Sequence, residues 1–455
     1  MKISSWILAA VAALTARSAH GVQAGRRRSP TLHFLDDDQA LCLDGSPGAF
    51  YLTPATEGSR SEDTWVIFFE GGGWCFTEED CLARSRSTAL NSVGSTVALG
   101  SFPNTNVRYQ QSILGGPQAQ VCAFNPALCE ANFVYLVYCD GNSFAGGRAD
   151  PLAINGSLVY FRGKRILDAA LSALGAFGLD HATEVLVTGD SAGGLATILH
   201  ADAVAAAVAA QSSSLRKAKA LPLSGFFPLL DTVQGLPVFA GQMQQAFATH
   251  NASAGVPQAC VAAVADPSYV WTCNTSPGAL ASVATPIFIL NSAYDAWATS
   301  CIFTLDADEA ACGAAPGWGL PCVGDSSPLG TVAAIFGPAD LCDEAQVSAL
   351  NDQWRPGFLA SLEATGVLGR NGSGAFVHTC HTHTAENLPL WSTIASDGGE
   401  AMVNAVANWW AEDEPAAAKP TYFAPCTWSV AAPHQCNPTC NPLGVLGDVM
   451  RTAAA

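Results

Sequence analysis

A serine flanked by small residues follows an apolar run in this chain of 455 residues. Residues 184–188 form the run, and Gly-Asp-Ser-Ala-Gly occupies 189–193. This order is typical of a buried strand and of the sharp strand-to-helix turn that exposes a serine hydroxyl. Residues 195–210 are alanine-rich, contain no glycine or proline and predict the following helix, whose N-terminus would favour an oxyanion. Ser191 is therefore the candidate nucleophile.

A serine nucleophile needs a base to accept its proton and an acid to orient that base. Asp295 stands shortly after the apolar run at 286–290, in the place that a triad acid takes in α/β-hydrolases. The alternative is an ordinary solvated loop aspartate. Three further aspartates are less well placed because they lie deeper in a cysteine-rich insertion: Asp306, Asp308 and Asp325.

Three histidines close together offer the base. His378, His381 and His383 stand in Val-His-Thr-Cys-His-Thr-His, just after a short apolar run at 375–377. His381 and His383 could also point the same way and bind a metal ion. No second cluster of cysteine and histidine has a recognisable ligand spacing, so we expect no metal and no cofactor.

Consecutive glycines offer the amides that would meet the charge developing on a carbonyl oxygen. Phe-Glu-Gly-Gly-Gly-Trp-Cys at 69–75 follows the apolar run at 65–69. Glycines let the backbone approach a ligand closely and turn successive amides toward it. The alternative is an ordinary tight turn.

Strand-like runs alternate with helical or looped stretches along the chain. This alternation predicts an α/β fold of the α/β-hydrolase type, a mostly parallel sheet with helices on both faces. Helical spacing covers 158–177, and cysteine- and proline-rich stretches at 250–284 and 301–345 predict disulfide-tied insertions or a cap. The predicted strands lie at 65–69, 133–138, 185–188, 220–227, 286–290 and 375–377.

The two ends of the chain differ from the predicted esterase domain at 25–412. Residues 1–24 have an early lysine, a short apolar stretch and a small-residue end, which predict a secretory signal peptide cleaved between 19 and 24. Residues 413–455 carry three cysteines and predict a stapled C-terminal extension. The chain has 16 cysteines, which fit a disulfide framework formed in an oxidising compartment. We expect a secreted protein of the extracellular space or cell wall.

Four Asn-X-Ser/Thr sequons fit the same route and would mark exposed loops. They lie at Asn155, Asn251, Asn274 and Asn371.

The chain is acidic, with 20 basic and 38 acidic residues and a formal net charge of −18. Removal of 1–24 takes away Lys2 and Arg17 and no acid, which changes the balance to 18 − 38 = −20. This charge argues against nucleic acid and anionic membranes as partners and would repel a polyanionic polymer at long range. We expect no stable membrane insertion, and the sequence does not predict the oligomeric state.

Five blocks in order along the chain resemble the pectin acetylesterase family, which also contains the Notum carboxylesterases. The blocks are 69–75, 138–144, 189–194, 291–297 and 380–383. The resemblance implies an α/β-hydrolase fold and the removal of acyl groups from oxygen esters by a Ser-Asp-His triad. It assigns Ser191 as nucleophile, Asp295 as acid and His383 as base, since His383 fits the family's C-x-x-H pattern.

The same resemblance implies that the amides of Gly73, Trp74 and Ala192 form the oxyanion hole. This chain departs from the plant members of the family at two positions. It has Asp190 where they usually have cysteine, and Thr384 where many of them have cysteine. Gly-Asp-Ser-Ala-Gly-Gly also occurs in the hormone-sensitive-lipase group, but that group places histidine before its glycines, where this chain has Glu70.

These observations predict a secreted serine carboxylesterase that removes O-acetyl groups from an extracellular or cell-wall polysaccharide. One alternative is a Notum-like esterase that removes a longer acyl chain from a secreted protein. Another is a non-catalytic, glycan-binding relative. The blocks at 138–144 and 291–297 look closer to the plant enzymes, so we expect a shallow acyl pocket.

Overall fold

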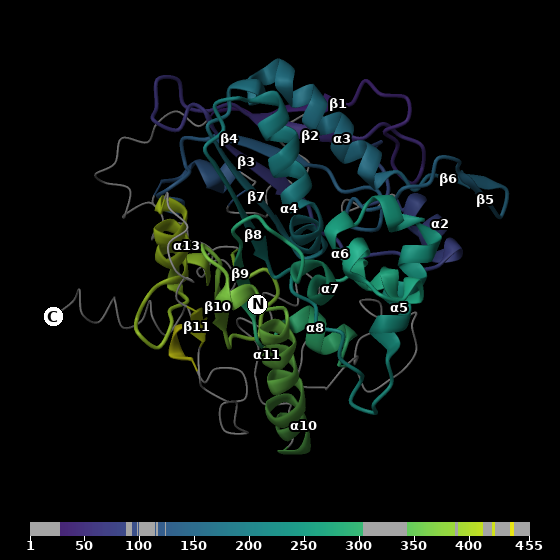
Figure 1. The fold of residues 1–455 in the computed structure, drawn as a ribbon, viewed down its shortest axis with the longest axis vertical. Coiled ribbons are helices and arrows are strands. Elements are labelled where there is room, and N and C mark those ends of the chain that lie inside the picture. Colours follow the sequence, from purple (N-terminus) through teal and green to yellow (C-terminus); the bar gives the residue numbers. More distant parts are fainter. Residues whose placement is uncertain are drawn as a thin grey trace, which may run out of the picture.

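A nine-stranded sheet forms the centre of the molecule (Figure 1). The computed structural model describes residues 28–87, 93–97, 99, 114, 117–122, 124–303, 344–386, 390–412, 421–423 and 437–440. Neighbouring strands from β4 to β11 are parallel, and β1 and β2 form an antiparallel edge. In sheet order the strands are β1 (Thr31–Phe34), β2 (Ala49–Thr53), β4 (Asn132–Leu136), β3 (Thr64–Phe69), β7 (Glu184–Asp190), β8 (Lys217–Leu223), β9 (Phe288–Ser292), β10 (Gly374–His378) and β11 (Thr421–Phe423).

Helices cover both faces of this sheet (Figure 1). The α-helices are α2 (Glu78–Ser85), α3 (Gly163–Leu174), α4 (Ala192–Gln211), α5 (Val238–Thr249), α6 (Gln258–Ala263), α7 (Ser276–Leu280), α8 (Ala296–Cys301), α10 (Glu344–Ala349), α11 (Arg355–Ala364), α12 (Leu390–Thr393) and α13 (Met402–Ala411). A π-helix at Leu350–Trp354 joins α10 to α11. The α/β-hydrolase-like prediction is confirmed.

Alternate residues of β3 enter two different cores. Trp65, Ile67 and Phe69 pack in the core that contains α3 and α4, whereas Val66 and Phe68 pack in the core that contains α12 and α13. All six residues of β3 are buried. A strand covered on both faces explains why its sequence is continuously apolar.

Helix α4 packs against the middle of the sheet, directly after Ser191. An 18-residue window of this helix has a mean hydropathy of 1.5, and 67% of the window is buried inside the protein. Among the described helices, α4 is apolar and long enough to cross a membrane. Its burial and its place on the sheet identify it as a core helix.

Most predicted elements are present within about three residues of their predicted bounds, and two differ more. The strand predicted at 220–227 ends at Leu223, because Ser224 has a positive φ of 46° and Gly225 approaches helix α4 closely. A Cβ atom on Gly225 would lie 2.4 Å from the carbonyl carbon of Gly194. Only glycine fits this contact.

The helix predicted over 158–177 is wrong at its start. Residues 152–159 form a hairpin of β5 (Leu152–Ile154) and β6 (Ser157–Val159), and α3 begins only at Gly163. Asn155 and Gly156 have φ values of 47° and 79°. An Asn-Gly pair with positive φ is the usual two-residue hairpin turn. This turn makes residues 152–159 a hairpin, although the apolar residues from 158 onward are spaced as in a helix.

Disulfides tie several loops to the sheet, and no cysteine in the described part of the chain is free. The insertion at 250–284 is helical and is closed by the bridge between Cys260 and Cys273. The insertion predicted at 301–345 lies largely outside the described residues. The described pairs are Cys42–Cys139, Cys75–Cys81, Cys122–Cys129, Cys260–Cys273 and Cys380–Cys440.

The last bridge joins the predicted C-terminal extension to the loop after β10. Strand β11 of the same segment pairs with β10 in parallel. Strand β11 therefore completes the edge of the sheet. The predicted signal peptide at 1–24 lies outside the described residues.

Three of the four sequon asparagines are exposed: Asn155, Asn251 and Asn371. The expectation is wrong for Asn274, which is fully buried. Its side-chain amide donates to Oδ1 of Asn142 at 3.0 Å. This asparagine packs inside the protein.

Candidate active site

Ser191 lies at a sharp turn between β7 and α4. Its φ of 56° and ψ of −123° are unusual for a residue with a side chain. The backbone N–H of Ser191 donates to the carbonyl of Leu223 at 2.9 Å, which fixes the turn against β8. The serine hydroxyl is thereby held at the carboxyl ends of the parallel strands.

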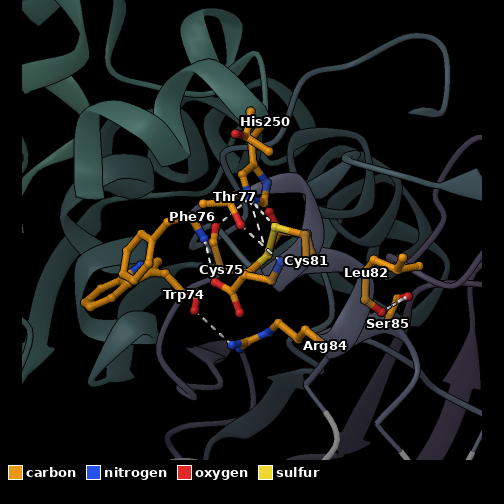
Figure 2. Close-up of a disulfide and its surroundings, with 12 residues drawn as sticks. Trp74, Cys75, Phe76, Thr77, Cys81, Leu82, Arg84, Ser85 and His250 are labelled. Carbon is orange, nitrogen blue, oxygen red and sulfur yellow. Dashed lines mark hydrogen bonds between the residues drawn. A yellow bond between two sulfur atoms is a disulfide. The ribbon is translucent and has the colours of Figure 1, made fainter. Parts of the chain in front are cut away.

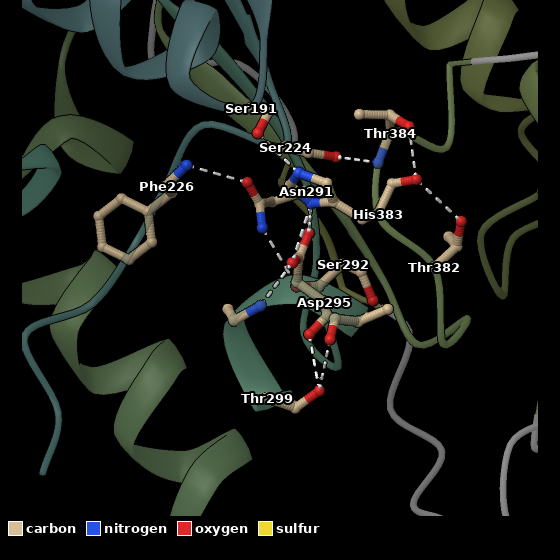
Figure 3. Close-up of polar contacts among 12 residues, drawn as sticks. Ser191, Ser224, Phe226, Asn291, Ser292, Asp295, Thr299, Thr382, His383 and Thr384 are labelled. Carbon is tan, nitrogen blue, oxygen red and sulfur yellow. Dashed lines mark hydrogen bonds and ion pairs between the residues drawn. The ribbon is translucent and has the colours of Figure 1, made fainter. Parts of the chain in front are cut away.

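His383 bridges Ser191 and Asp295 (Figure 3). Nδ1 of His383 lies 2.8 Å from Oδ2 and 3.0 Å from Oδ1 of Asp295. A carboxylate only accepts hydrogen bonds, so Nδ1 carries the proton, and Nε2 accepts from the Ser191 hydroxyl at 2.8 Å. The structure thus brings the three predicted triad residues into one hydrogen-bonded row.

Two neighbouring strands carry the acid and the base to the same edge of the sheet. Strands β9 and β10 are paired in parallel, and Asp295 and His383 follow their carboxyl ends. Asp295 caps α8 through a hydrogen bond from the Ala298 N–H to Oδ1 at 2.9 Å. The N–H of Thr384 donates to Oγ of Ser224 at 3.0 Å, which fixes the backbone next to His383. Thr384, where many plant members have cysteine, is therefore held in place by a hydrogen bond from its backbone.

The charges around His383 favour its protonated form. Burial lowers the pKa of His383, but the carboxylates of Asp295 and Asp190 raise it, and the net shift is upward. Burial lowers the pKa of His378 to about 3, so that side chain stays neutral. His383, and neither of the other two histidines, lies between the acid and the serine.

The glycine loop, residues 71–74, runs beside this row with its carbonyls bound on one side. Arg84 of α2 donates to the carbonyls of Gly72 and Gly73 at 2.6 and 3.3 Å. It also donates to the carbonyl of Trp74 at 3.3 Å (Figure 2). The Tyr138 hydroxyl donates to the Gly73 carbonyl at 2.7 Å. A trans peptide unit points its C=O and its N–H in opposite directions. The amides of Gly73 and Trp74 therefore point away from Arg84.

The amides of the predicted oxyanion hole are available for a ligand. Within the described part of the chain, the N–H groups of Gly73 and Trp74 donate no hydrogen bond. Ala192 is the first residue of α4, so its amide belongs to the group that has no acceptor within the helix. The oxyanion assignment of Gly73, Trp74 and Ala192 stays a prediction that this arrangement favours.

One hydroxyl connects the glycine loop to the serine turn. Ser143 accepts from Nε1 of Trp74 at 2.8 Å and donates to the carbonyl of Ala192 at 2.7 Å. The roles of Ser143 and Arg84 were not predicted from the sequence. One sequence feature could have indicated Arg84: it lies on a short helix that the Cys75–Cys81 bridge ties to the glycine loop.

Aromatic side chains pack next to the base. Trp74, Phe227 and Trp297 have ring centres 5.0 to 5.3 Å apart, and Phe239 lies 6.1 Å from both tryptophans. Phe227 and Trp297 each lie 6.4 Å from the His383 ring. We call Trp74, Phe227, Phe239 and Trp297 the aromatic cluster. It gives the site an apolar wall.

A close group of potential metal ligands in the described residues is Cys75, Cys81 and His250 (Figure 2). The two sulfur atoms are bonded to each other, so they are not thiolate ligands. His250 Nε2 donates to the carbonyl of Cys75 at 3.0 Å. This group is a structural disulfide packed on a buried histidine.

Comparisons with known proteins match most of the chain. The family model described as Pectinacetylesterase matches residues 24–441. The chain is 28% identical over 407 residues to pectin acetylesterase 5 of Arabidopsis thaliana, covering 88% of this chain and 82% of that protein. It is 32% identical over 174 residues to the palmitoleoyl-protein carboxylesterase NOTUM of Mus musculus, covering 38% of this chain and 31% of that protein.

A solved structure has the same fold. The structure of the Wnt deacylase Notum from Drosophila superposes with a TM-score of 0.67 at 20% identity, covering 91% of this chain and 99% of that one. The family match and these named relatives agree with the resemblance drawn from the sequence blocks. The chain belongs to the pectinacetylesterase family and is a carboxylic ester hydrolase.

Proposed function

We propose that the protein is a secreted serine esterase that removes O-acetyl groups from an extracellular or cell-wall polysaccharide through the triad of Ser191, His383 and Asp295. The observation that carries the proposal is the position of His383, hydrogen-bonded to the serine hydroxyl and to the buried carboxylate at 2.8 Å each. This arrangement suits proton transfer from a nucleophile to an oriented base.

In the proposed reaction, the Ser191 oxygen attacks the ester carbonyl while His383 Nε2 takes the hydroxyl proton. The amides of Gly73, Trp74 and Ala192 donate to the negative oxygen of the tetrahedral intermediate. The intermediate collapses when His383 returns the proton to the leaving sugar oxygen, which leaves an acyl-enzyme. Water then attacks with His383 as base, and the acid and Ser191 are released.

Two observations support a short acyl group on a glycan. The aromatic cluster occupies space beside His383, with Phe227 and Phe239 each only 2% exposed. The match to pectin acetylesterase 5 also covers far more of the chain than the match to NOTUM. A Notum-like activity on a longer acyl chain of a secreted protein is the second candidate, favoured by the shared fold.

Labelling with a fluorophosphonate probe tests the triad. The purified enzyme should be labelled at Ser191, and Ser191→Ala should lose both the label and the turnover of p-nitrophenyl acetate. His383→Ala should lower turnover by about 10³-fold or more, whereas His381→Ala should have a far smaller effect. A label on another residue, or the opposite ranking of the histidines, would contradict the assignment.

Acetate release tests the substrate. The enzyme should release acetate from acetylated polysaccharides, and the Ser191→Ala variant should release none. Turnover of p-nitrophenyl esters without acetate release from any acetylated polysaccharide would favour the second candidate. Residues 1–24 should be missing from the secreted protein, which N-terminal sequencing checks.

A further inference from the structure

Residues 138–144 connect the glycine loop to the start of α4. This Tyr-Cys-Asp-Gly-Asn-Ser-Phe segment follows β4, and all seven of its residues are buried. The bridge between Cys139 and Cys42 holds it to the N-terminal part of the fold. A buried loop must find partners for its polar groups inside the protein. Ser143 is the residue at which these contacts converge.

The backbone at Ser143 and Phe144 is in the left-handed region, with φ values of 51° and 61°. Residues with a side chain keep this conformation only where the surrounding structure fixes it. Here Oδ1 of Asp140 accepts from the N–H of Phe144 at 3.0 Å. The carbonyl of Asn142 accepts from the N–H of Ala145 at 2.9 Å. The segment therefore fixes its own turn and with it the direction of the Ser143 hydroxyl.

All polar groups of Ser143 are hydrogen-bonded. Its N–H donates to the Tyr138 hydroxyl at 3.1 Å, and its carbonyl accepts from Nε2 of His200 at 3.0 Å. Its hydroxyl accepts from Nε1 of Trp74 at 2.8 Å and donates to the carbonyl of Ala192 at 2.7 Å. An indole N–H only donates and a carbonyl only accepts, so the direction of both hydroxyl bonds is fixed.

The two bonds of this hydroxyl join parts of the site that must be aligned. Trp74 carries a predicted oxyanion amide, and its ring lies 5.0 Å from Phe227 and 5.3 Å from Trp297 in the aromatic cluster. Ala192 carries another predicted oxyanion amide, directly after the nucleophile. An indole ring bound at its N–H cannot turn without losing that bond. The hydroxyl therefore holds both amides and the orientation of one ring in the aromatic wall.

We propose that Ser143 is a positioning residue that sets both the rate of ester hydrolysis and the preference for short acyl groups. Through Trp74 and Ala192 it keeps the oxyanion amides aligned with the Ser191 hydroxyl. Through the indole N–H it keeps the aromatic wall in place beside the acyl group. Ser143 is fully buried and acts through these neighbours. The inference rests on the proposed function of the triad, the oxyanion amides and the aromatic cluster.

Ser143→Ala removes the hydroxyl from the indole N–H and the Ala192 carbonyl. Misplaced amides should lower kcat for p-nitrophenyl acetate by about 10- to 100-fold, with KM within about threefold of wild type. A ring that can turn should admit longer chains, so the ratio of kcat/KM for hexanoate to that for acetate should rise by about tenfold. Active enzyme is counted by fluorophosphonate titration of Ser191, so partial unfolding alone changes neither quantity.

Two further variants isolate the hydroxyl and its bond to the indole. Ser143→Gly removes the same hydroxyl with a relaxed backbone, because glycine adopts positive φ without strain, and it should reproduce both changes. Trp74→Phe removes the indole N–H but keeps an aromatic ring and the backbone amide. In the Trp74→Phe background, Ser143→Ala should change the hexanoate-to-acetate ratio by less than about twofold, because the bond that holds the ring is already absent.

Thr197→Val is the matched control. Thr197 is a fully buried residue of α4, and its hydroxyl donates to the carbonyl of Gly193 at 2.9 Å. The variant therefore removes a buried hydroxyl from the carbonyl next to that of Ala192. It should keep kcat and the hexanoate-to-acetate ratio within about twofold of wild type, since a hydroxyl bond to the preceding helical turn contributes little.

The outcomes separate this inference from the proposed function. A wild-type enzyme without Ser191 labelling would contradict the proposed function. With an active wild-type enzyme, a change in only one of the two quantities, or in neither, in folded Ser143→Ala or Ser143→Gly would overturn this inference alone. Equal changes in Thr197→Val would overturn it too. If neither Ser143 variant folds, Trp74→Phe decides: a lower kcat with a higher ratio supports the inference, and unchanged values overturn it.

Discussion

The guanidinium of Arg84 lies over the ring of Tyr138, 5.4 Å from the ring centre, and both side chains donate to the carbonyl of Gly73. Arg84 also binds the carbonyls on either side of it. The glycine loop is therefore held from behind by one arginine, which leaves its amides facing the other way. A loop fixed in this manner keeps its donors in place before the charge on the substrate develops.

Arg84→Met should lower kcat by about 10- to 100-fold with little change in KM, because the loop amides are proposed to act on the transition state. Arg84→Lys should be intermediate, since an ammonium group lacks the planar fork of five donors. Arg86→Met is the matched control, because Arg86 ends the same helix, is exposed and contacts half-buried Ser157. Steady-state kinetics on p-nitrophenyl acetate check the ranking, and equal effects at positions 84 and 86 would contradict it.

The Cys75–Cys81 bridge connects the glycine loop to α2, and the Cys122–Cys129 bridge is its control. The bridges span 6 and 7 residues, so their removal should cost similar chain entropy in the unfolded state. Cys75→Ser with Cys81→Ser should lower kcat by about tenfold, because α2 carries Arg84 to the loop. Cys122→Ser with Cys129→Ser should lower Tm without that loss. Similar kcat losses in both double variants would mean that the bridge acts only through global stability.

The sequence predicted the elements that carry the site because their signals are local. The apolar run before Ser191, the three glycines at 71–73 and the histidine cluster each occupy one short stretch. Parallel strands bring such stretches to the same edge of the sheet, so chain order and strand position were enough to bring Asp295 to His383. Among the histidines, the family's spacing from Cys380 selected His383, and the geometry agrees.

Other features depend on contacts between distant segments, and no local pattern predicts these. Arg84 contacts three carbonyls of the glycine loop only because α2 folds back over it. The buried state of Asn274 depends on Asn142, which is 132 residues away in the chain. Strand β11 has three residues and an ordinary composition, and its pairing with β10 follows from the end of the chain returning to the sheet edge.

His250 should make stability depend on pH. Burial lowers its pKa to about 3, whereas an unfolded histidine has a pKa near 6.5. Below about pH 6.5 the unfolded state binds a proton that the folded state does not, so this group destabilises the fold as the pH falls toward 3. His250→Gln, which keeps a donor for Cys75, should remove about 1.4 kcal/mol of that loss per pH unit.

The measurement is the free energy of unfolding of wild type and variant at several pH values between about 7 and 4. The free energy by which the wild type is more stable than His250→Gln should shrink as the pH falls. His181→Gln is the control, because its side chain is 80% exposed and its replacement should leave the pH dependence unchanged. A difference that stays constant with pH would mean that His250 is not kept neutral in the folded protein.

The aromatic cluster should make the enzyme prefer short acyl groups. Each methylene that enters a complementary pocket contributes about 0.8 kcal/mol, or about fourfold in kcat/KM. An open apolar channel would therefore favour octanoate over acetate by a large factor. Because Phe227 and Trp297 pack beside His383 and Phe239 packs against Trp297, we expect p-nitrophenyl acetate to have the highest kcat/KM and the rate to fall with chain length.

Phe239→Ala tests whether the cluster sets this preference. Removal of the ring should open room beside Trp74 and Trp297 and raise kcat/KM for butyrate and hexanoate relative to acetate by about tenfold. Phe177→Ala is the control, because that ring is 43% exposed on the surface. In the wild-type enzyme, a rate that rises steadily from two to eight carbons would contradict the polysaccharide deacetylase proposal. It would then favour an acylated secreted protein as substrate, because only a pocket that admits the whole chain gains from each added methylene.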